Sequence, residues 1–118
     1  MTPAEFKTLR EGMGLAAEEV ATMLGVTRKT VFAMESPTRA LDVPEEHAER
    51  LREFHKEFLR AVSRAKRRKV LPRFTDEERF QKVYGEGLPL SVQGPLIYAA
   101  QGFRAGETAT VAPVDYER

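Results

Sequence analysis

Residues 15–35 contain two short stretches of helical hydrophobic periodicity, separated by a glycine. In the first stretch, Val20, Ala21 and Leu24 recur at helical spacing, so one stripe of this helix is expected to be buried. Gly25 follows at once, and a glycine just past the last periodic residue is typical of a helix that ends in the left-handed conformation. The pattern therefore predicts two short helices joined by a tight turn.

The second of these helices has one apolar and one mostly polar face. Thr27 is placed to cap it, because its hydroxyl can accept a hydrogen bond from an unpaired backbone N–H group of the first turn. Val31 and Met34 share the face that is expected to be buried. The opposite face carries two cations, an aromatic residue and a small residue: Arg28, Lys29, Phe32 and Ala33. Such a face suits a helix that enters a DNA groove, whereas an ordinary helical hairpin is the alternative.

The N-terminus carries a helix-start signature. Thr2 stands at the N-cap position, Pro3 follows it, and Glu5 completes a capping box. The helix that begins here is expected to end at Gly12 or Gly14.

A long helix is predicted from Asp42 or Pro44 to about Arg68. Phe54 and Leu59 widen its stripe of helically spaced positions, which are Ala48, Leu51, His55, Phe58, Val62 and Ala65. The stripe is wider than the two positions of a coiled-coil seam, which favours docking onto the rest of the chain. A coiled-coil seam is the alternative.

The C-terminal half is predicted to contain a short edge strand at 70–74, a helix that ends at Gly85 and a final helix at 91–103. Residues 107–118 are expected to form a tail, within which 108–114 could pair as an edge strand. In a monomer the apolar side of the final helix would need another cover, so we expect it to form a dimer interface. The interface residues would be Leu90, Leu96, Ile97, Ala100 and Phe103.

The net charge of +1 hides an uneven distribution. Residues 1–43 hold five basic and six acidic residues, residues 44–74 hold ten and five, and residues 75–118 hold four and seven, so the three net charges are −1, +5 and −3. The basic third includes Arg64 and the run at 66–69. These cations could simply complement a helix dipole, or they could contact phosphates.

The composition argues against several classes of protein. The absence of cysteine fits a reducing cytoplasm, as in a bacterial or phage-infected cell, and excludes disulfides and thiol chemistry. Neither a leader nor a long apolar run is present, so we expect no export and no membrane. His47 and His55 lack a third ligand-like group, which argues against a metal site. Without a nucleophile–base pair, a metal cluster or a phosphate loop, no enzyme, cofactor or small-molecule ligand is expected.

Further positions around the two short helices fit a known pattern: Leu9, Arg10, Leu15, the Val20-Ala21 pair, Leu24-Gly25-Val26-Thr27, Val31 and Glu35. With these features, residues 3–37 resemble the helix-turn-helix of the Xre or phage-repressor class. The resemblance implies a lambda-repressor-like helical bundle with an ion pair between Arg10 and Glu35. It also implies that the next loop follows the DNA backbone, with phosphate contacts from Ser36, Thr38 and Arg39.

The chain departs from this family at Ala17, where a glutamine often bonds to a DNA phosphate or a partner side chain. Ala17 can do neither, so backbone N–H groups would have to serve at that helix end. Phe32 and Ala33 also stand where the family tends to be polar. They could touch thymine methyl groups, or Phe32 could be a packing residue.

Residues 72–103, PRFTDEERFQKVYGEGLPLSVQGPLIYAAQGF, carry a second resemblance. They look like the C-terminal part of YdiL-like proteins and of some anti-CRISPR-associated autoregulators. There, a short strand, an FQ-V-Y helix and a final helix dimerise the protein. Gly94 and Pro95 depart from the bulkier residues expected at the start of the last helix.

Together these features predict a mainly α protein with a small α/β region at the C-terminal end. A helix-turn-helix domain would span 1–43, a connecting helix 44–69, a dimerisation region 70–106 and a tail 107–118. The expected function is that of a homodimeric repressor, often an autorepressor, on a palindromic operator in double-stranded DNA. Base edges would be read by Arg28 and Lys29, apolar contacts made by Phe32 and Ala33, and phosphates held by Thr27, Ser36, Thr38 and Arg39.

Two alternatives stay open at this point. An antitoxin would repress its operon while masking a toxin, and a neighbouring toxin gene would favour it. A protein-interaction module that keeps the helical fold without binding DNA is favoured by Ala17 and by the slightly acidic residues 1–43. A gel shift with the DNA upstream of the gene would separate the DNA-binding classes from the interaction module.

Overall fold

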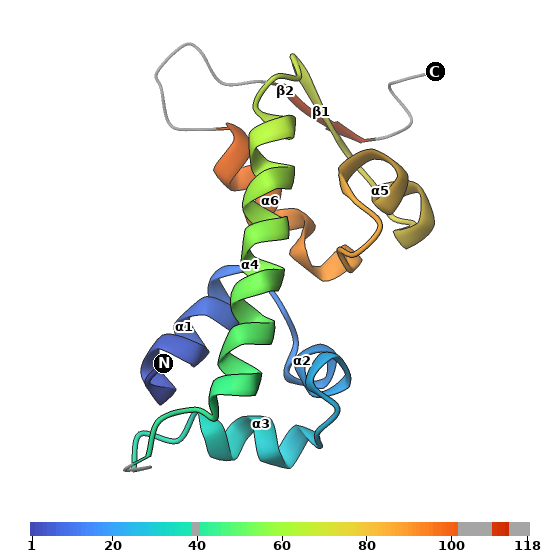
Figure 1. Ribbon diagram of the computed structural model, residues 1–118. Coiled ribbons are helices and arrows are strands. Elements are labelled where there is room, and N and C mark those ends of the chain that lie inside the picture. Colours follow the sequence, from blue (N-terminus) through green and yellow to red (C-terminus); the bar gives the residue numbers. More distant parts are fainter. Residues whose placement is uncertain (39–40, 102–109, 114–118) are drawn as a thin grey trace. The chain divides into compact units, whose positions relative to one another are not determined.

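The computed structural model describes residues 1–38, 41–101 and 110–113, which form a mainly helical protein (Figure 1). The elements in chain order are α1 (Pro3–Gly12), α2 (Ala17–Leu24), α3 (Arg28–Met34), α4 (Glu45–Ala65), β1 (Val70–Arg73), α5 (Glu77–Tyr84), the 3₁₀ turn η1 (Leu90–Val92), α6 (Gln93–Gln101) and β2 (Thr110–Pro113). The chain divides into a first unit, Met1–Lys56, and a second unit, Glu57–Arg118, and the division falls inside α4. The long helix predicted as a separate connecting element is therefore shared by two units.

The predicted capping box starts α1. The backbone N–H of Glu5 donates to Thr2 Oγ1 at 3.1 Å, and the backbone N–H of Thr2 donates to Glu5 Oε1 at 3.3 Å. Hydrogen bonds to the Glu5 carboxyl from the side chain and the backbone N–H of Thr2 lower the pKa of this carboxyl from its ordinary value. The helix ends at Gly12, and Gly14 turns the chain toward α2 with a φ of 76°, a conformation that suits glycine.

The turn between α2 and α3 has the geometry that Gly25 predicted. Gly25 adopts a left-handed conformation, with φ 69° and ψ 32°, directly after Leu24. Its N–H group donates to the carbonyl of Thr22 at 3.3 Å, and the N–H group of Val26 donates to the carbonyl of Ala21 at 3.0 Å. This pair of bonds is a Schellman motif, which satisfies the last carbonyls of α2 and reverses the chain within two residues.

Thr27 caps α3 as predicted, since its hydroxyl accepts a hydrogen bond from the backbone N–H of Thr30 at 3.1 Å. Val31 and Met34 are buried, also as predicted. They belong to a core that the first unit builds from α1 to the start of α4, with Phe6, Met13, Leu15, Val20, Ala21, Val43, Ala48 and Leu51. This buried side of α3 fixes which residues face outward.

The helix α4 ends at Ala65, before the predicted end near Arg68. The N–H groups of Arg67 and Arg68 bond to carbonyls three residues back, at 3.2 and 3.0 Å, so the helix tightens and stops. Leu71 is fully buried in β1. The helix therefore has to end early enough for the chain to place Leu71 in the core. Helical periodicity carries no information about that requirement.

The predicted stripe along α4 is buried at its apolar positions: Ala48, Leu51, Phe58, Val62 and Ala65. His55 is half-buried, and Leu59, which was predicted to widen the stripe, is exposed. Because these apolar groups are covered within one chain, the structure agrees with the docking interpretation of the stripe.

The second unit holds a parallel pair of strands (Figure 1). β1 and β2 pair in register from Val70 opposite Thr110 to Arg73 opposite Pro113, and α6 contacts both strands. This confirms the predicted strand at 70–74, and within the predicted tail it shows the pairing that was given only as an alternative for 108–114.

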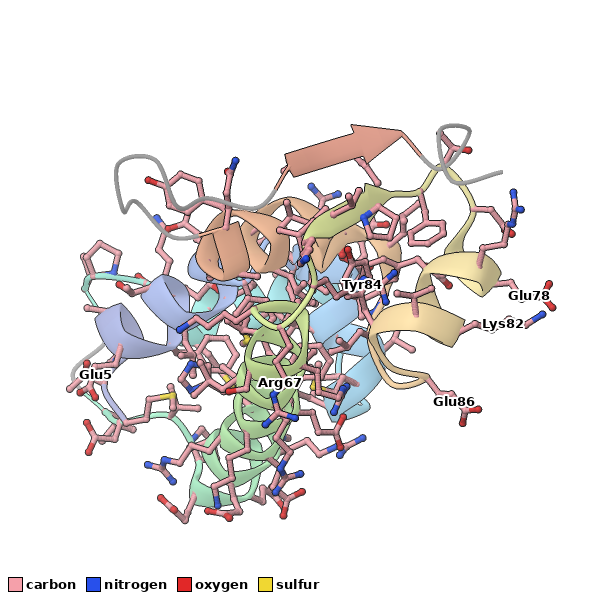
Figure 2. All side chains as sticks on the ribbon, turned by 90° about the horizontal axis from the view of Figure 1, so that it is seen from above. Glu5, Arg67, Glu78, Lys82, Tyr84 and Glu86 are labelled. Atoms are coloured by element: carbon pink, nitrogen blue, oxygen red, sulfur yellow. The ribbon has the colours of Figure 1, made fainter. Side chains whose placement is uncertain are left out.

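Side chains satisfy backbone groups of β1 and of the residue that follows it. Tyr84, which is buried, donates its hydroxyl to the carbonyl of Pro72 at 2.9 Å (Figure 2). The buried amide of Gln93 accepts from the N–H of Phe74 at 2.6 Å and donates to the carbonyl of Phe74 at 2.9 Å. Gln93 thus bonds to Phe74 as a neighbouring strand would, a role that the sequence pattern did not indicate.

Three residues of the predicted dimer interface on α6 lie in the core of the chain. Leu96, Ile97 and Ala100 are buried within a single chain, with exposed fractions of 0%, 4% and 7%. They are buried because α6 packs against β1 and β2, a cover that the sequence did not reveal. Leu90 is half-buried, and Phe103 lies outside the described residues.

Candidate nucleic-acid interface

The outer face of α3 is exposed to solvent. It comprises the cap and the predicted contact residues together with Thr30: Thr27, Arg28, Lys29, Thr30, Phe32 and Ala33. Sequence reasoning missed Thr30, although its helical position beside Arg28 and Phe32 could have placed it on this face. These residues, from Thr27 to Ala33 without Val31, are called the α3 outer face below.

Arg28 and Phe32 lie one helical turn apart and contact each other. The guanidinium carbon of Arg28 is 5.3 Å from the centroid of the Phe32 ring, within the range of a cation–π interaction. Nη1 of Arg28 also lies 3.7 Å from Oε1 of Glu18 in α2. Both of those charged side chains are exposed, and an exposed ion pair contributes only ~0–1 kcal/mol, so Glu18 does not lock Arg28 in place.

The hydroxyl groups at the two ends of α3 are arranged in pairs. Oγ1 of Thr27 and Oγ1 of Thr30 are 2.9 Å apart, and Oγ of Ser36 and Oγ1 of Thr38 are also 2.9 Å apart. In each pair one hydroxyl donates to the other, which leaves the second hydrogen able to bond to another acceptor, such as a phosphate oxygen. Arg39, the strongest predicted phosphate contact, lies outside the described residues.

Ala17 does not belong to this exposed set. Its side chain is buried as part of the first unit's core, although it is the first residue of α2. A helix start is often exposed, but here the packing of α2 turns this position inward. The buried side chain leaves the backbone N–H groups at this helix end as the predicted contact of Ala17, and that contact stays a prediction.

An ion pair inside the first unit joins α1 to the residue that ends α3. Arg10 bonds to Glu35 through both arms of its guanidinium, Nε to Oε2 at 2.5 Å and Nη2 to Oε1 at 3.0 Å, and it donates to the carbonyl of Leu15 at 3.0 Å. The hydrogen bond to Glu35 raises the pKa of Arg10. The side chains are 11% and 4% exposed, so this is a buried pair that positions the end of α3. The Arg10–Glu35 pair predicted from the family resemblance is confirmed.

The basic run of the second unit begins in α4 and continues into the turn after it. Nη2 of Arg64 donates to the carbonyl of Tyr84 at 2.7 Å, whereas Arg67 lies in the turn after the helix (Figure 2). Earlier in α4, Arg52 is paired with Glu45 at 2.8 Å. No carboxylate in the described part of the chain forms an ion pair with three of the later cations, Lys66, Arg67 and Lys69. Carboxylates of the described residues therefore do not neutralise the charges of these three side chains.

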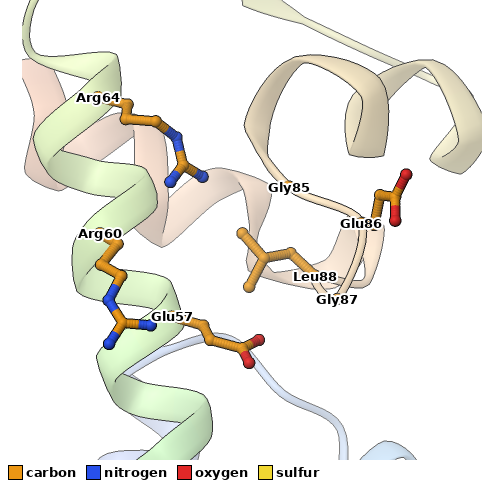
Figure 3. A pocket seen from close by; sticks show the side chains of 7 residues that line it. All are labelled: Glu57, Arg60, Arg64, Gly85, Glu86, Gly87 and Leu88. Atoms are coloured by element: carbon orange, nitrogen blue, oxygen red, sulfur yellow. The ribbon is translucent and has the colours of Figure 1, made fainter.

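A surface cavity of about 290 Å³ lies in the second unit, where α4 faces the loop after α5 (Figure 3). It is lined by Glu57, Arg60, Arg64, Gly85, Glu86, Gly87 and Leu88. A side chain at Gly87 would bring its Cβ within 2.8 Å of Oε2 of Glu57, the far end of a flexible side chain that can move aside. Two arginines and two glutamates balance each other, and the lining favours no single class of ligand.

Among the residues that the structure describes, no group of three or more histidine or acidic side chains is placed to hold a metal ion. In the same part of the chain, no helix has the length and apolar character needed to cross a membrane. The chain matches no family model, no curated protein and no solved structure.

Proposed function

We propose that this protein is a sequence-specific DNA-binding regulator of the Xre or phage-repressor type, with a lambda-repressor-like helix-turn-helix formed by α2 and α3. The observation that carries the proposal is the α3 outer face, which presents Arg28 and Lys29 to solvent while Val31 and Met34 hold the opposite side in the core. A rigid short helix with exposed cations is the element that a major groove accepts. The buried Arg10–Glu35 pair supports this role because it fixes the end of α3.

The residues of the α3 outer face have distinct roles in this proposal. Arg28 and Lys29 read base edges, with guanine the preferred partner of Arg28. Thr27, Ser36 and Thr38 contact phosphates and set the register of the helix on the duplex.

Binding as a homodimer follows from the size of α3. A helix of seven residues is about 10 Å long and spans about three base pairs, too few to define a unique site. Two copies on a palindromic operator double the base contacts, with half-sites about one helical turn apart. The buried side of α6 is not the surface that joins the copies. The regulator would repress its promoter by excluding polymerase from the operator.

Arg28→Ala tests the proposal directly. We expect a loss of about 1–3 kcal/mol of specific binding and a relaxed preference at one base pair of each half-site, because a bidentate contact to guanine is removed. The measurement is a binding titration against a duplex selected from a random-sequence library. Arg79→Ala in α5 is the matched control, since it removes an exposed arginine outside α3. Equal binding by Arg28→Ala and the parent protein would exclude the α3 outer face as the reader.

The basic run provides a second test. If it contacts phosphates, replacing Arg67 and Arg68 by alanine should flatten the slope of log affinity against log salt by roughly 1–2 units. The control is the double change at Arg79 and Lys82 in α5, which alters the net charge equally. A slope that both double variants leave unchanged would mean that the run only completes the end of α4.

A protein-interaction module is the second candidate. Phe32 favours it, because an exposed aromatic side chain is typical of protein interfaces. A parent protein that enriches no duplex from the random library would decide for this candidate.

A further inference from the structure

Phe32 is an exposed apolar residue on an otherwise polar helix face. The side chain of Phe32 is 46% exposed. The structure describes every residue of α3, and Phe32 is the large apolar side chain of this helix that lies outside the core. The core of the first unit is complete without it, since Val31 and Met34 fill the buried side of the helix. The ring is therefore available for an apolar group of a partner.

The ring of Phe32 also biases the position of Arg28 without fixing it, because this exposed contact is about as weak as the ion pair with Glu18. With its guanidinium carbon 5.3 Å from the ring centroid, Arg28 has a stacking partner on its own helix, one turn ahead. A planar guanidinium held against a ring presents its N–H donors in a defined plane, which lowers the conformational entropy lost when it pairs with guanine O6 and N7. Arg28 and Phe32 thus act as one structural group.

The chemistry of the major groove selects a partner for each half of this group. Guanine offers two acceptors to an arginine, and the 5-methyl group of thymine is the apolar contact that the groove offers to a phenylalanine. Four helical residues advance about 6 Å, and stacked base pairs are about 3.4 Å apart. The two side chains therefore reach base pairs that are at most about two steps apart.

We propose that Arg28 and Phe32 form a two-residue reader that requires a thymine within about two base pairs of the guanine bound by Arg28. The inference rests on the proposed function, because it concerns how the α3 outer face reads DNA. It makes Phe32 a specificity-determining residue through its contact with the thymine methyl group and a positioning residue for Arg28.

The experiment uses the full chain and a duplex selected from a random-sequence library. The selected duplex is then synthesised with deoxyuridine in place of the one thymidine near the guanine in a single half-site, which removes one methyl group and keeps the base pair. The parent protein should bind the deoxyuridine duplex about four-fold more weakly, the effect of one buried methyl-sized group. Phe32→Ala should bind the two duplexes equally, whereas the control Tyr98→Ala, which changes an exposed aromatic residue of α6, should keep the four-fold difference.

Phe32→Leu tests the coupling to Arg28, since leucine keeps an apolar contact but removes the ring. This variant should still prefer thymine over uracil, while its discrimination against replacement of the guanine falls below that of the parent protein. Discrimination as strong as in the parent would overturn the positioning role of Phe32.

The outcomes separate the two proposals. Selected duplexes without a thymine near the guanine, equal binding of thymine and uracil by the parent, or a four-fold difference retained by Phe32→Ala would each overturn the two-residue reader and leave DNA binding standing. If the parent selects no duplex at all, the proposed function fails and the reader fails with it.

Discussion

Glu35→Leu should lower the free energy of unfolding by about 3 kcal/mol, because it leaves the guanidinium of Arg10 buried without its carboxylate. Removing one member of a buried pair exposes the full desolvation cost of the other, whereas an exposed pair would cost at most ~1 kcal/mol. The double variant Arg10→Met/Glu35→Leu should recover most of the loss, since it replaces both charges by apolar groups of similar size. Urea denaturation of the parent, both single variants and the double variant measures this coupling.

The pH dependence of this stabilisation follows from Arg10. The hydrogen bond to Glu35 raises the pKa of Arg10 above its ordinary value, so the contribution of the pair is fully present below that ordinary value and is lost only as the pH rises through the higher folded-state value. Arg10 therefore stays charged at neutral and at mildly alkaline pH. We expect Glu35→Leu to lower the free energy of unfolding by the same amount at both. A loss below ~1 kcal/mol would show that the pair behaves like a solvated one and does not anchor α3.

Ile97→Asp should unfold the second unit, with a loss of about 4–5 kcal/mol. Ile97 is 4% exposed, so an aspartate there is a carboxylate buried without a partner. A loss of this size is a large fraction of the stability of a typical domain. Circular dichroism and limited proteolysis should show the unfolding at every protein concentration.

Ala99→Asp is the matched control for this variant, because Ala99 lies on the exposed side of the same helix. It should keep the fold. If the parent protein is a dimer and Ile97→Asp gives a folded monomer, Ile97 belongs to the dimer interface that the sequence predicted. Sedimentation velocity over a range of concentrations distinguishes these outcomes.

The sequence by itself determined the local structure of the first unit. The bonds of Thr2 with Glu5, the left-handed turn at Gly25 and the cap at Thr27 each join residues within a few positions of one another. Interactions of that range depend on residue type and spacing, so a sequence pattern can predict them. The orientation of α3 followed from the same logic, because helical periodicity assigns Val31 and Met34 to one side.

Only the tertiary structure decided features that depend on distant partners. Ile97 was predicted to lie in an interface and is buried within the chain by elements that periodicity cannot place. Gln93 found its partner nineteen positions earlier, at Phe74, where its amide bonds to the backbone. The ion pair between Arg10 and Glu35, which are twenty-five positions apart, was predicted from the family resemblance and not from their spacing. Burial and long-range hydrogen bonds depend on how the helices and strands pack, and packing is a property of the assembled chain that no local pattern of residues contains.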